Sequence, residues 1–250
     1  MGTQILAWPQ PDSAPALDHN RVHVWAWNLD RPPSDSDWHI LSEEETARAR
    51  RFVFPQDRDR YVCAHAALRA LLSQYTAIPA GQIAFACNPY GKPQVETDPA
   101  SPPIHFNLTH SAGLAALAVS RDYKLGIDIE MIRPVDADVA AHHFSPSELR
   151  TLDHLPAPQW LDGFFRCWTS KEALLKGVGL GLNRPLDSFD VEVSPQLTPA
   201  LVAVAPQTNI PLAWTLVELK PADHFAGALA VHDPGKTFQR SSLQYFSLRP

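Results

Sequence analysis

The sequence predicts an α+β fold built from two similar halves. Apolar residues recur at helical spacing over residues 57–75 and again around Trp168. Each stretch accompanies short strands of small apolar residues, and residues 111–119 resemble residues 225–231 in carrying an Ala-Gly step. This repeated order favours two halves packed about a pseudo-twofold axis, with the cleft between them as the expected active site.

The composition is that of a globular protein with a sizeable apolar core. The chain has 250 residues, a hydrophobic content of 45% and a formal net charge of −6, which suits one large domain or two smaller ones. We expect an N-terminal half over residues 1–120 and a C-terminal half over residues 121–250. The acidic balance indicates no broad basic surface for nucleic acid.

The cysteines and the N-terminal segment indicate a cytoplasmic location. Cys63, Cys87 and Cys167 lack the spacing of metal ligands, which is typical of free thiols in a reducing compartment. The first 20 residues contain three prolines and no long apolar run, so we expect no signal peptide. No segment is long and apolar enough to span a membrane. We expect a cytoplasmic monomer.

The N-terminal half is expected to begin with a strand and two helices. Alternating apolar residues predict a strand over residues 21–29. Ser42 followed by Glu45 has the pattern of a capping box and predicts the start of a helix. The apolar periodicity of residues 57–75 predicts a longer helix, and a short strand is expected at residues 83–86.

Turns and short strands follow in the middle of the chain. Lys92 lies in a turn between a glycine and a proline. Strands are predicted over residues 104–108, 114–119 and 125–130, and we expect the last two to pair as a hairpin. His110 would then lie just before one strand of this hairpin.

Asp128 and Glu130 belong to the last of these strands. They are two residues apart, so their side chains point to the same face of the strand. Two carboxylates in this position repel each other unless a cation lies between them. The alternative is that they form only the polar face of an edge strand.

The segment from Trp168 to Lys176 predicts a helix that carries charges within an apolar sequence. Glu172 and Lys176 are four residues apart and therefore share one helix face, while Lys171 precedes Glu172 directly. Taken alone, the Glu172–Lys176 pair is typical of an intrahelical salt bridge on a solvated face.

Asp128, Glu130 and Glu172 together form a set of three carboxylates. Hard oxygen ligands of this kind suit Mg²⁺, which commonly shares its coordination shell with substrate phosphates. Single basic residues that could face such phosphates are Arg48, Lys92, His110, Lys171 and Lys176. Each basic residue also has an ordinary alternative, such as a hydrogen-bonded turn histidine or a solvated lysine.

Five motifs occur in one order over about residues 40–190. They are Gly91-Lys92-Pro93, Phe106-Asn107-Leu108-Thr109-His110-Ser111, Gly126-Ile127-Asp128-Ile129-Glu130, Phe144-Ser145-Pro146-Ser147-Glu148 and Trp168-Thr169-Ser170-Lys171-Glu172-Ala173-Leu174-Leu175-Lys176. In order and spacing the sequence resembles the 4′-phosphopantetheinyl transferases, in the larger, two-half (Sfp-type) branch that activates carrier proteins of peptide, polyketide and fatty-acid synthases. One departure is Thr109, where the family more often has serine, but the hydroxyl is kept.

The resemblance implies coenzyme A as the substrate and Mg²⁺ as the cofactor. Asp128, Glu130 and Glu172 would hold Mg²⁺ against the pyrophosphate. A serine hydroxyl of an acyl or peptidyl carrier protein would attack the β-phosphate, with Glu172 or a metal-bound water as the general base. Lys176 would neutralise charge on the departing 3′,5′-ADP.

The resemblance also implies which residues bind coenzyme A. They are Arg48, Lys92, Asn107, Thr109, His110, Lys171 and Lys176. Arg48, Lys92 and His110 occupy positions that in the family face the 3′-phosphate and neighbouring phosphates, whereas Asn107 and Thr109 flank the nucleotide. Further candidates are Arg60 and Arg69.

Two other classes of function remain open from the residues alone. One is a metal-dependent phosphohydrolase that uses the same carboxylates with water as the nucleophile. The other is a non-catalytic module that binds coenzyme A or a carrier protein. The sequence leaves open which synthase is served and whether Mg²⁺ or Mn²⁺ is used.

The segment that follows Lys176, residues 179–193, is expected to contact the carrier protein. It contains an apolar run with Leu182 and Leu186, and Arg184 could steer an acidic carrier helix. The alternative is that these residues belong to the core between the two halves.

Overall fold

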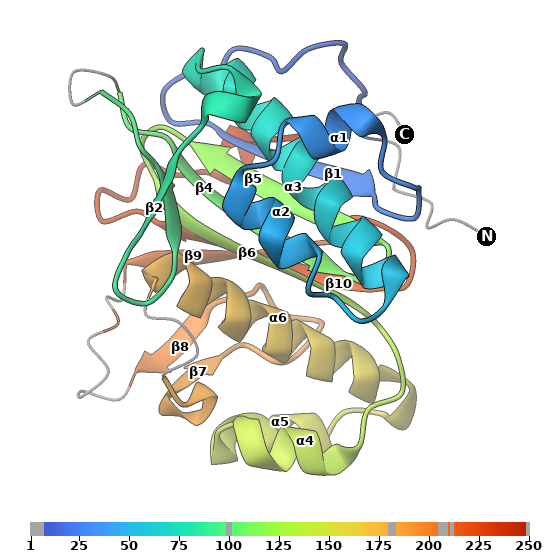
Figure 1. Ribbon diagram of the computed structural model, residues 1–250. Helices are drawn as coiled ribbons and strands as arrows, with labels where there is room; N and C mark the ends of the chain where they lie inside the picture. Colours follow the sequence, from blue (N-terminus) through green and yellow to red (C-terminus); the bar gives the residue numbers. More distant parts are fainter. Residues whose placement is uncertain (1–7, 99–101, 180–183, 205–209, 211–212, 249–250) are drawn as a thin grey trace.

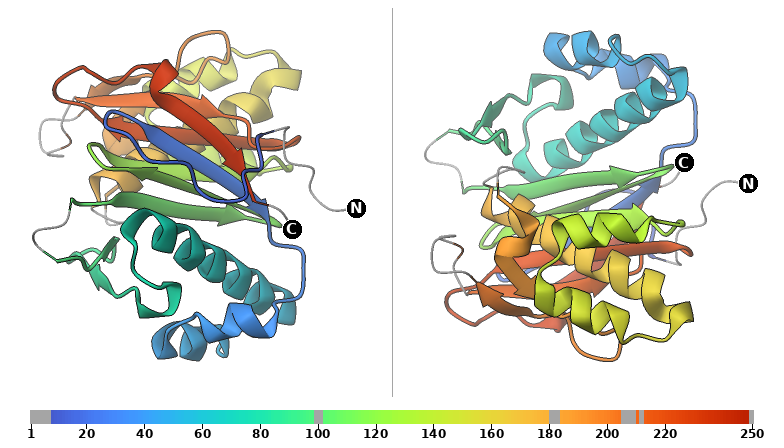
Figure 2. Two further views of the ribbon diagram at one scale, coloured as in Figure 1. Left: turned by 90° about the horizontal axis from the view of Figure 1, so that it is seen from above. Right: turned by 90° about the horizontal axis from the view of Figure 1, so that it is seen from below.

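Two β-sheets pack face to face at the centre of the protein, and helices cover the outer face of each (Figures 1 and 2). The computed structural model describes residues 8–98, 102–179, 184–204, 210 and 213–248. Three apolar clusters fill the spaces between these layers: one beneath each set of helices and one between the sheets. The predicted α+β class with two halves is confirmed.

The helices and strands follow one another in an order close to the predicted one. The helices are α1 (Asp35–His39), α2 (Glu43–Ala49), α3 (Pro55–Thr76), α4 (Ala137–His143), α5 (Pro146–Asp153) and α6 (Trp160–Val178). The strands are β1 (Val22–Asn28), β2 (Phe85–Cys87), β3 (Pro93–Val95), β4 (His105–Ser111), β5 (Leu114–Ser120), β6 (Lys124–Met131), β7 (Phe189–Val191), β8 (Leu201–Val204), β9 (Trp214–Leu219), β10 (Phe225–His232) and β11 (Leu243–Ser247). Among the helices that the structure describes, none has the length and apolar character needed to cross a membrane.

The first sheet has the strand order β11-β1-β5-β4, and α3 covers its outer face. β5 runs antiparallel to both β1 and β4. Leu68 and Leu72 of α3 join Trp25 and Leu117 of the sheet in one apolar cluster. The predicted helical face of residues 57–75 is therefore the face that packs on this sheet.

The second sheet has the strand order β6-β10-β9, and α6 covers its outer face. α6 approaches β6 very closely at one point. A β-carbon on Gly126 would lie 2.1 Å from the Ala173 carbonyl oxygen and 2.2 Å from the Gly177 nitrogen. Only glycine permits such an approach, and it brings the charged side chains of α6 onto β6.

The two faces of β6 have opposite characters, as the sequence predicted. Ile127 and Ile129 join Val22 and Val24 in the apolar cluster between the sheets. Side chains alternate along a strand, so Asp128 lies on the other face, towards α6.

The predicted hairpin between residues 114–119 and 125–130 is wrong. β5 pairs with β4 and β1, whereas β6 pairs with β10 in the other sheet. The β4–β5 turn contains Ala112 with a φ of 48°, a conformation that sequence patterns assign mainly to glycine and asparagine. His110 consequently lies inside β4 and not in a turn before β5.

The C-terminal strand departs from the predicted division of the chain. β11 runs parallel to β1, with Leu243 opposite Val22. Its residues had been assigned to the C-terminal half, but they complete the sheet of the N-terminal half. The first sheet is thus built from both ends of the chain.

Candidate active site

Strands β4 and β6 lie side by side where the two sheets meet, and polar side chains connect them. We call this contact the β4–β6 seam, which comprises Asn107, Thr109, Ser111, Ile127, Asp128 and Glu130. The backbone N–H of Ile127 donates to Asn107 Oδ1 at 2.8 Å. Thr109 Oγ1 donates to Asp128 Oδ1 at 3.1 Å. Two residues predicted to flank a nucleotide therefore hold β6 in this structure.

Ser111 continues the seam beyond Thr109. Its hydroxyl donates to Glu130 Oε2 at 2.6 Å and accepts from the Met131 N–H at 3.2 Å. One side chain thus orients a carboxylate and fixes the strand that carries it. The sequence analysis quoted Ser111 within a motif but assigned it no role; its alternation with Thr109 on one strand face was the available signal.

Asp128 is the central residue of the seam. It is buried, and Lys176 Nζ of α6 lies 2.6 Å from its Oδ1. Burial raises the pKa of Asp128 to about 6; Lys176 opposes this shift, while Glu130 and Glu172 add to it. The predicted Glu172–Lys176 helix face therefore exists, but its lysine pairs with β6.

Glu172 lies one helical turn before Lys176 and is half-buried. Burial raises the pKa of Glu172, and Glu130 raises it further, whereas Lys176 and His143 lower it. Asp128, Glu130 and Glu172 are thus close enough to repel one another. A cluster of this kind favours a proton or a cation.

The seam offers oxygen donors that suit a divalent cation, although they are not arranged around a common point. Among the described residues, no group of three histidine, cysteine, aspartate or glutamate side chains could hold a metal ion as they are placed. Asp128 Oδ2 is nevertheless buried and has no hydrogen-bond partner among those residues. An unpartnered carboxylate oxygen beside two further carboxylates fits the donor chemistry of Mg²⁺.

A cavity of about 580 Å³ lies on the N-terminal half and is lined by Arg48, Tyr61, His65 and Phe106. The guanidinium carbon of Arg48 lies 5.6 Å from the centre of the Tyr61 ring. The Tyr61 and His65 rings are stacked with their centroids 3.9 Å apart. Aromatic rings can stack on a purine base, and an arginine beside them can neutralise a phosphate.

His110 interacts electrostatically with both the seam and this cavity. Desolvation of its ring by the surrounding protein lowers the pKa of His110. The charges of Lys176 and Arg48 lower this pKa further, while the charge of Glu130 raises it. The free protein therefore favours a neutral ring. A phosphate dianion beside His110 would shift this balance towards the imidazolium.

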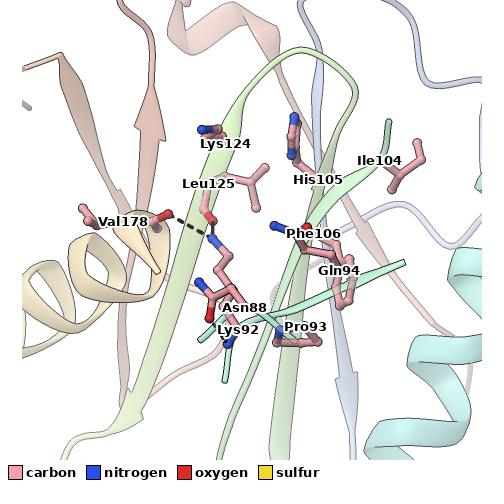
Figure 3. Close-up of a pocket in the computed structure, with 11 residues that line it drawn as sticks. Asn88, Lys92, Pro93, Gln94, Ile104, His105, Phe106, Lys124, Leu125 and Val178 are labelled. Atoms are coloured by element: carbon pink, nitrogen blue, oxygen red, sulfur yellow. Dashed lines mark hydrogen bonds between the residues drawn. The ribbon is translucent and has the colours of Figure 1, made fainter. Parts of the chain in front are cut away.

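Lys92 lies at a different place from Arg48. Its ammonium donates to the Leu125 carbonyl at 2.8 Å and to the Gly177 carbonyl at 3.0 Å (Figure 3). Burial, followed by the charge of Lys124, lowers the pKa of Lys92 to about 8. The structure thus directs this lysine towards backbone carbonyls of the C-terminal half.

Lys171 does not face the seam, so the prediction that it binds a phosphate is not supported. Its side chain is completely buried, and Nζ lies 2.8 Å from Glu148 Oε1. The same ammonium donates to the carbonyls of Leu186 at 2.7 Å and Phe189 at 2.5 Å. The motif residue Glu148, which had no predicted role, is its buried counter-charge.

The two further arginine candidates are also engaged elsewhere. Arg60 donates to Asp30 Oδ1 through Nε at 2.9 Å and Nη2 at 2.7 Å. Arg69 is buried and pairs with Glu45 at 2.6 Å. Both arginines therefore join segments of the N-terminal half in this structure.

The predicted carrier-binding segment, residues 179–193, is mostly part of the core where it can be followed. Leu186, Phe189, Val191 and Val193 are buried in the apolar cluster beneath α6. Leu182 lies outside the described residues, and Arg184 is half-buried. The alternative interpretation, that this run packs in the core, accounts for the described part.

Comparisons with known proteins agree with the resemblance found in the motifs. Residues 124–230 match the model of the 4′-phosphopantetheinyl transferase superfamily. Residues 26–122 match a model described as 4′-phosphopantetheinyl transferase, N-terminal. Together the two matches span both halves of the chain.

Individual relatives extend over most of the chain. The 4′-phosphopantetheinyl transferase HetI of Nostoc sp. is 37% identical, over 89% of this chain and 92% of the relative. The 4′-phosphopantetheinyl transferase Sfp of Bacillus subtilis is 31% identical, over 69% of this chain and 77% of the relative. The L-aminoadipate-semialdehyde dehydrogenase-phosphopantetheinyl transferase of Mus musculus is 28% identical, over 85% and 75% respectively. The chain therefore belongs to the 4′-phosphopantetheinyl transferase superfamily, in its two-domain, Sfp-type branch.

Proposed function

We propose that this 4′-phosphopantetheinyl transferase moves the phosphopantetheine arm of coenzyme A to a carrier-protein serine at the β4–β6 seam and releases 3′,5′-ADP. The observation that carries the proposal is the ion pair of Asp128 with Lys176, which lies next to two more carboxylates. Transfer of a phosphate-linked group depends mainly on positioning and on neutralising charge. The seam supplies groups of both signs for this purpose.

Glu172 is the proposed general base. Its raised pKa makes the carboxylate a better proton acceptor than an exposed glutamate. In the proposed step the serine proton passes to Glu172 while the serine oxygen bonds to the β-phosphorus. The bond from that phosphorus to the bridging oxygen breaks, and the electron pair leaves on 3′,5′-ADP. Lys176 is placed to neutralise this charge.

Asp128, Glu130 and Glu172 are the residues that would hold Mg²⁺. When bound, Mg²⁺ would neutralise pyrophosphate oxygens and make the β-phosphorus more electrophilic. The unpartnered Oδ2 of Asp128 supports this assignment. Mg²⁺ and Mn²⁺ both accept carboxylate oxygens, so either ion fits these residues.

The nucleotide end of coenzyme A is proposed to occupy the cavity beside Arg48. His65, backed by the buried Tyr61 ring, would stack against the adenine, and Arg48 and His110 would neutralise the 3′-phosphate. The arm would then extend across the seam. Beside Glu130 lies an apolar cavity of about 250 Å³, lined in part by Val139, Phe164 and Trp168, which would receive its pantetheine end.

Replacement of His110 tests the phosphate assignment. We expect His110→Ala to raise the Michaelis constant for coenzyme A by roughly ten- to a hundredfold, because a charge-assisted hydrogen bond contributes about 1.5–3 kcal/mol. The turnover number should change little, because the 3′-phosphate takes no part in the bond that breaks. The variant and the wild-type protein should bind 3′-dephospho-coenzyme A alike. Equal losses for both substrates would remove His110 from the 3′-phosphate site.

The reaction itself is tested with a panel of acyl and peptidyl carrier domains from fatty-acid, polyketide and peptide synthases. Mass spectrometry should show the mass of the phosphopantetheine arm on the carrier serine and one 3′,5′-ADP released per arm. Coenzyme A alone should remain intact, because the acceptor is absent. Release of 3′,5′-ADP without a carrier would identify a phosphohydrolase, and binding without turnover would identify a non-catalytic module.

The proposed partners are therefore coenzyme A and apo-carrier proteins, with no membrane or nucleic acid involved. We propose that the protein acts as a monomer in the cytoplasm. Its described cysteines are free thiols, which is typical of a reducing compartment, and one chain supplies both halves of the candidate active site. Which synthase supplies the carrier is the question that the same panel answers.

A further inference from the structure

We propose that the turn from Asn88 to Lys92 is a clamp between the two halves that positions the end of α6 for catalysis. Lys92 then acts through α6 and β6 and is a positioning residue, not a ligand of coenzyme A. The inference rests on the proposed function, because it concerns the efficiency of that reaction.

The clamp consists of three hydrogen bonds from the N-terminal half to the C-terminal half. Lys92 Nζ donates to the carbonyls of Leu125 in β6 and Gly177 in α6, at 2.8 Å and 3.0 Å. Asn88 Nδ2 donates to the Gly179 carbonyl at 2.7 Å. Figure 3 shows the Lys92 side chain crossing to these two elements. One turn thus binds both elements that carry the Asp128–Lys176 pair.

Hydrogen bonds within the turn orient these two donor side chains. Asn88 Oδ1 accepts the backbone N–H groups of Tyr90 and Lys92, both at 2.9 Å. The Asn88 N–H also donates to the Lys92 carbonyl at 3.0 Å. Asn88 therefore fixes the turn with its oxygen and reaches α6 with its nitrogen.

The C-terminal end of α6 is shaped to receive the clamp. Gly179 ends the helix with a φ of 76°, a conformation that favours glycine. A β-carbon at Gly179 would lie 3.0 Å from Asn88 Nδ2 and 3.1 Å from Lys92 Cδ. Unpaired carbonyls at a helix C-terminus attract a cation, so the Lys92 ammonium satisfies groups that α6 cannot satisfy itself.

The position of the clamp connects it to the chemistry. Gly177 directly follows Lys176 in α6, and Leu125 precedes Asp128 by three residues in β6. Holding both carbonyls on one ammonium fixes the distance between the two elements at their common end. Loss of the clamp should let the last turn of α6 fray, and the Lys176–Asp128 geometry would loosen with it.

The test compares Lys92→Met with Lys124→Met in the full chain. Methionine keeps the apolar stem of Lys92 but removes the donor. Lys124 lines the same cavity of about 200 Å³ and carries the same charge but makes none of the three clamp hydrogen bonds, so its replacement is a matched control. We expect Lys92→Met to lower kcat at least tenfold with KM for coenzyme A within about threefold, whereas Lys124→Met leaves both unchanged.

Hydrogen exchange supplies a readout that does not depend on activity. The amides of residues 175–179 should exchange at least tenfold faster in Lys92→Met than in the wild-type protein, and Lys92→Arg should restore part of the protection. If Lys92→Met fails to fold, Asn88→Ala provides the second test, because it removes the bond to Gly179 and the two bonds that hold the turn; it should show the same pattern.

The outcomes separate the two ideas. A raised KM with unchanged kcat would make Lys92 a phosphate ligand and overturn the clamp, as would unchanged exchange at the end of α6. Absence of transfer by the wild-type protein would instead contradict the proposed function.

Discussion

Asp128 is subject to opposing demands that explain its raised pKa. It is buried between β4 and α6, which disfavours its ionised form, yet Thr109 and Lys176 bind that form. Burial is the larger effect. Because the folded protein binds a proton more tightly than the unfolded chain, the stability contributed by this group is present below pH 3.8 and is lost as the pH rises through about 6.

Replacement of Asp128 by asparagine should separate stability from activity. A pKa change from 3.8 to about 6 corresponds to roughly 3 kcal/mol. Urea titrations of both proteins without metal measure the free energy of unfolding at each pH. Between pH 4 and pH 7 this free energy should fall by an amount of that order more in the wild-type protein than in Asp128→Asn. Transfer should fall about 10²–10³-fold in the variant, the usual loss for one well-placed electrostatic group.

Magnesium provides the control for this prediction. At pH 7, Mg²⁺ should raise the midpoint of thermal unfolding in the wild-type protein, because a ligand that binds the folded state stabilises it. Asp128→Asn should respond much less. An equal rise in both proteins would place the metal away from Asp128.

At the scale of elements, the sequence correctly predicted helices whose limits depend on residues close together in the chain. The capping box of Ser42 and Glu45 starts α2 as expected, with mutual hydrogen bonds at 3.1 Å and 2.9 Å. The longer helix ends within one residue of its predicted limit at Tyr75. Both depend on neighbours in sequence, which a pattern can reveal.

Pairing between elements was less predictable, because it depends on distant residues. The β4–β5 turn uses Ala112 in a left-handed conformation, which no local pattern indicates. An intrahelical Glu172–Lys176 pair was one alternative that the sequence offered, whereas Lys176 binds Asp128 on β6. The motifs grouped the three carboxylates, which interact in the structure; the seam that supports them was not predicted.

The buried Glu148–Lys171 pair joins α5 to α6 and should be a structural feature. Glu148 also accepts the N–H groups of Val191 at 2.8 Å and Ser145 at 2.9 Å. Lys171→Met should lower the free energy of unfolding by about 3–5 kcal/mol, because it leaves a buried carboxylate without its counter-charge. Denaturant titration measures this loss.

A double variant provides the control for that pair. Lys171→Met combined with Glu148→Gln should be less unstable than the sum of the single changes, since neither partner is left charged alone. Folded Lys171→Met should retain the wild-type affinity for coenzyme A. If the folded Lys171→Met variant binds coenzyme A more weakly than the wild-type protein, Lys171 is a phosphate ligand after all.

At the scale of the whole molecule, the two halves are joined by more than the connection between β5 and β6. The apolar cluster between the sheets draws residues from β1 and β5 on one side and from β6, β9 and β10 on the other. β11 belongs to the first sheet although it comes from the end of the chain. The candidate active site therefore lies at a junction that neither half can form alone.

This arrangement predicts that the N-terminal half is not an independent folding unit. A fragment of residues 1–122 would lack β11, expose the inner face of its sheet and leave Asn107 and Thr109 without β6. We expect it to show no cooperative thermal transition by circular dichroism, because the apolar surface left open exceeds what a stable domain tolerates. Residues 239–250, attached through a flexible linker, should restore the edge strand but not the seam, and so recover little structure. Addition of the separate C-terminal fragment, residues 123–250, should restore a cooperative transition and transfer activity together. A fragment of residues 1–122 that unfolds cooperatively near the midpoint of the full chain would contradict this dependence.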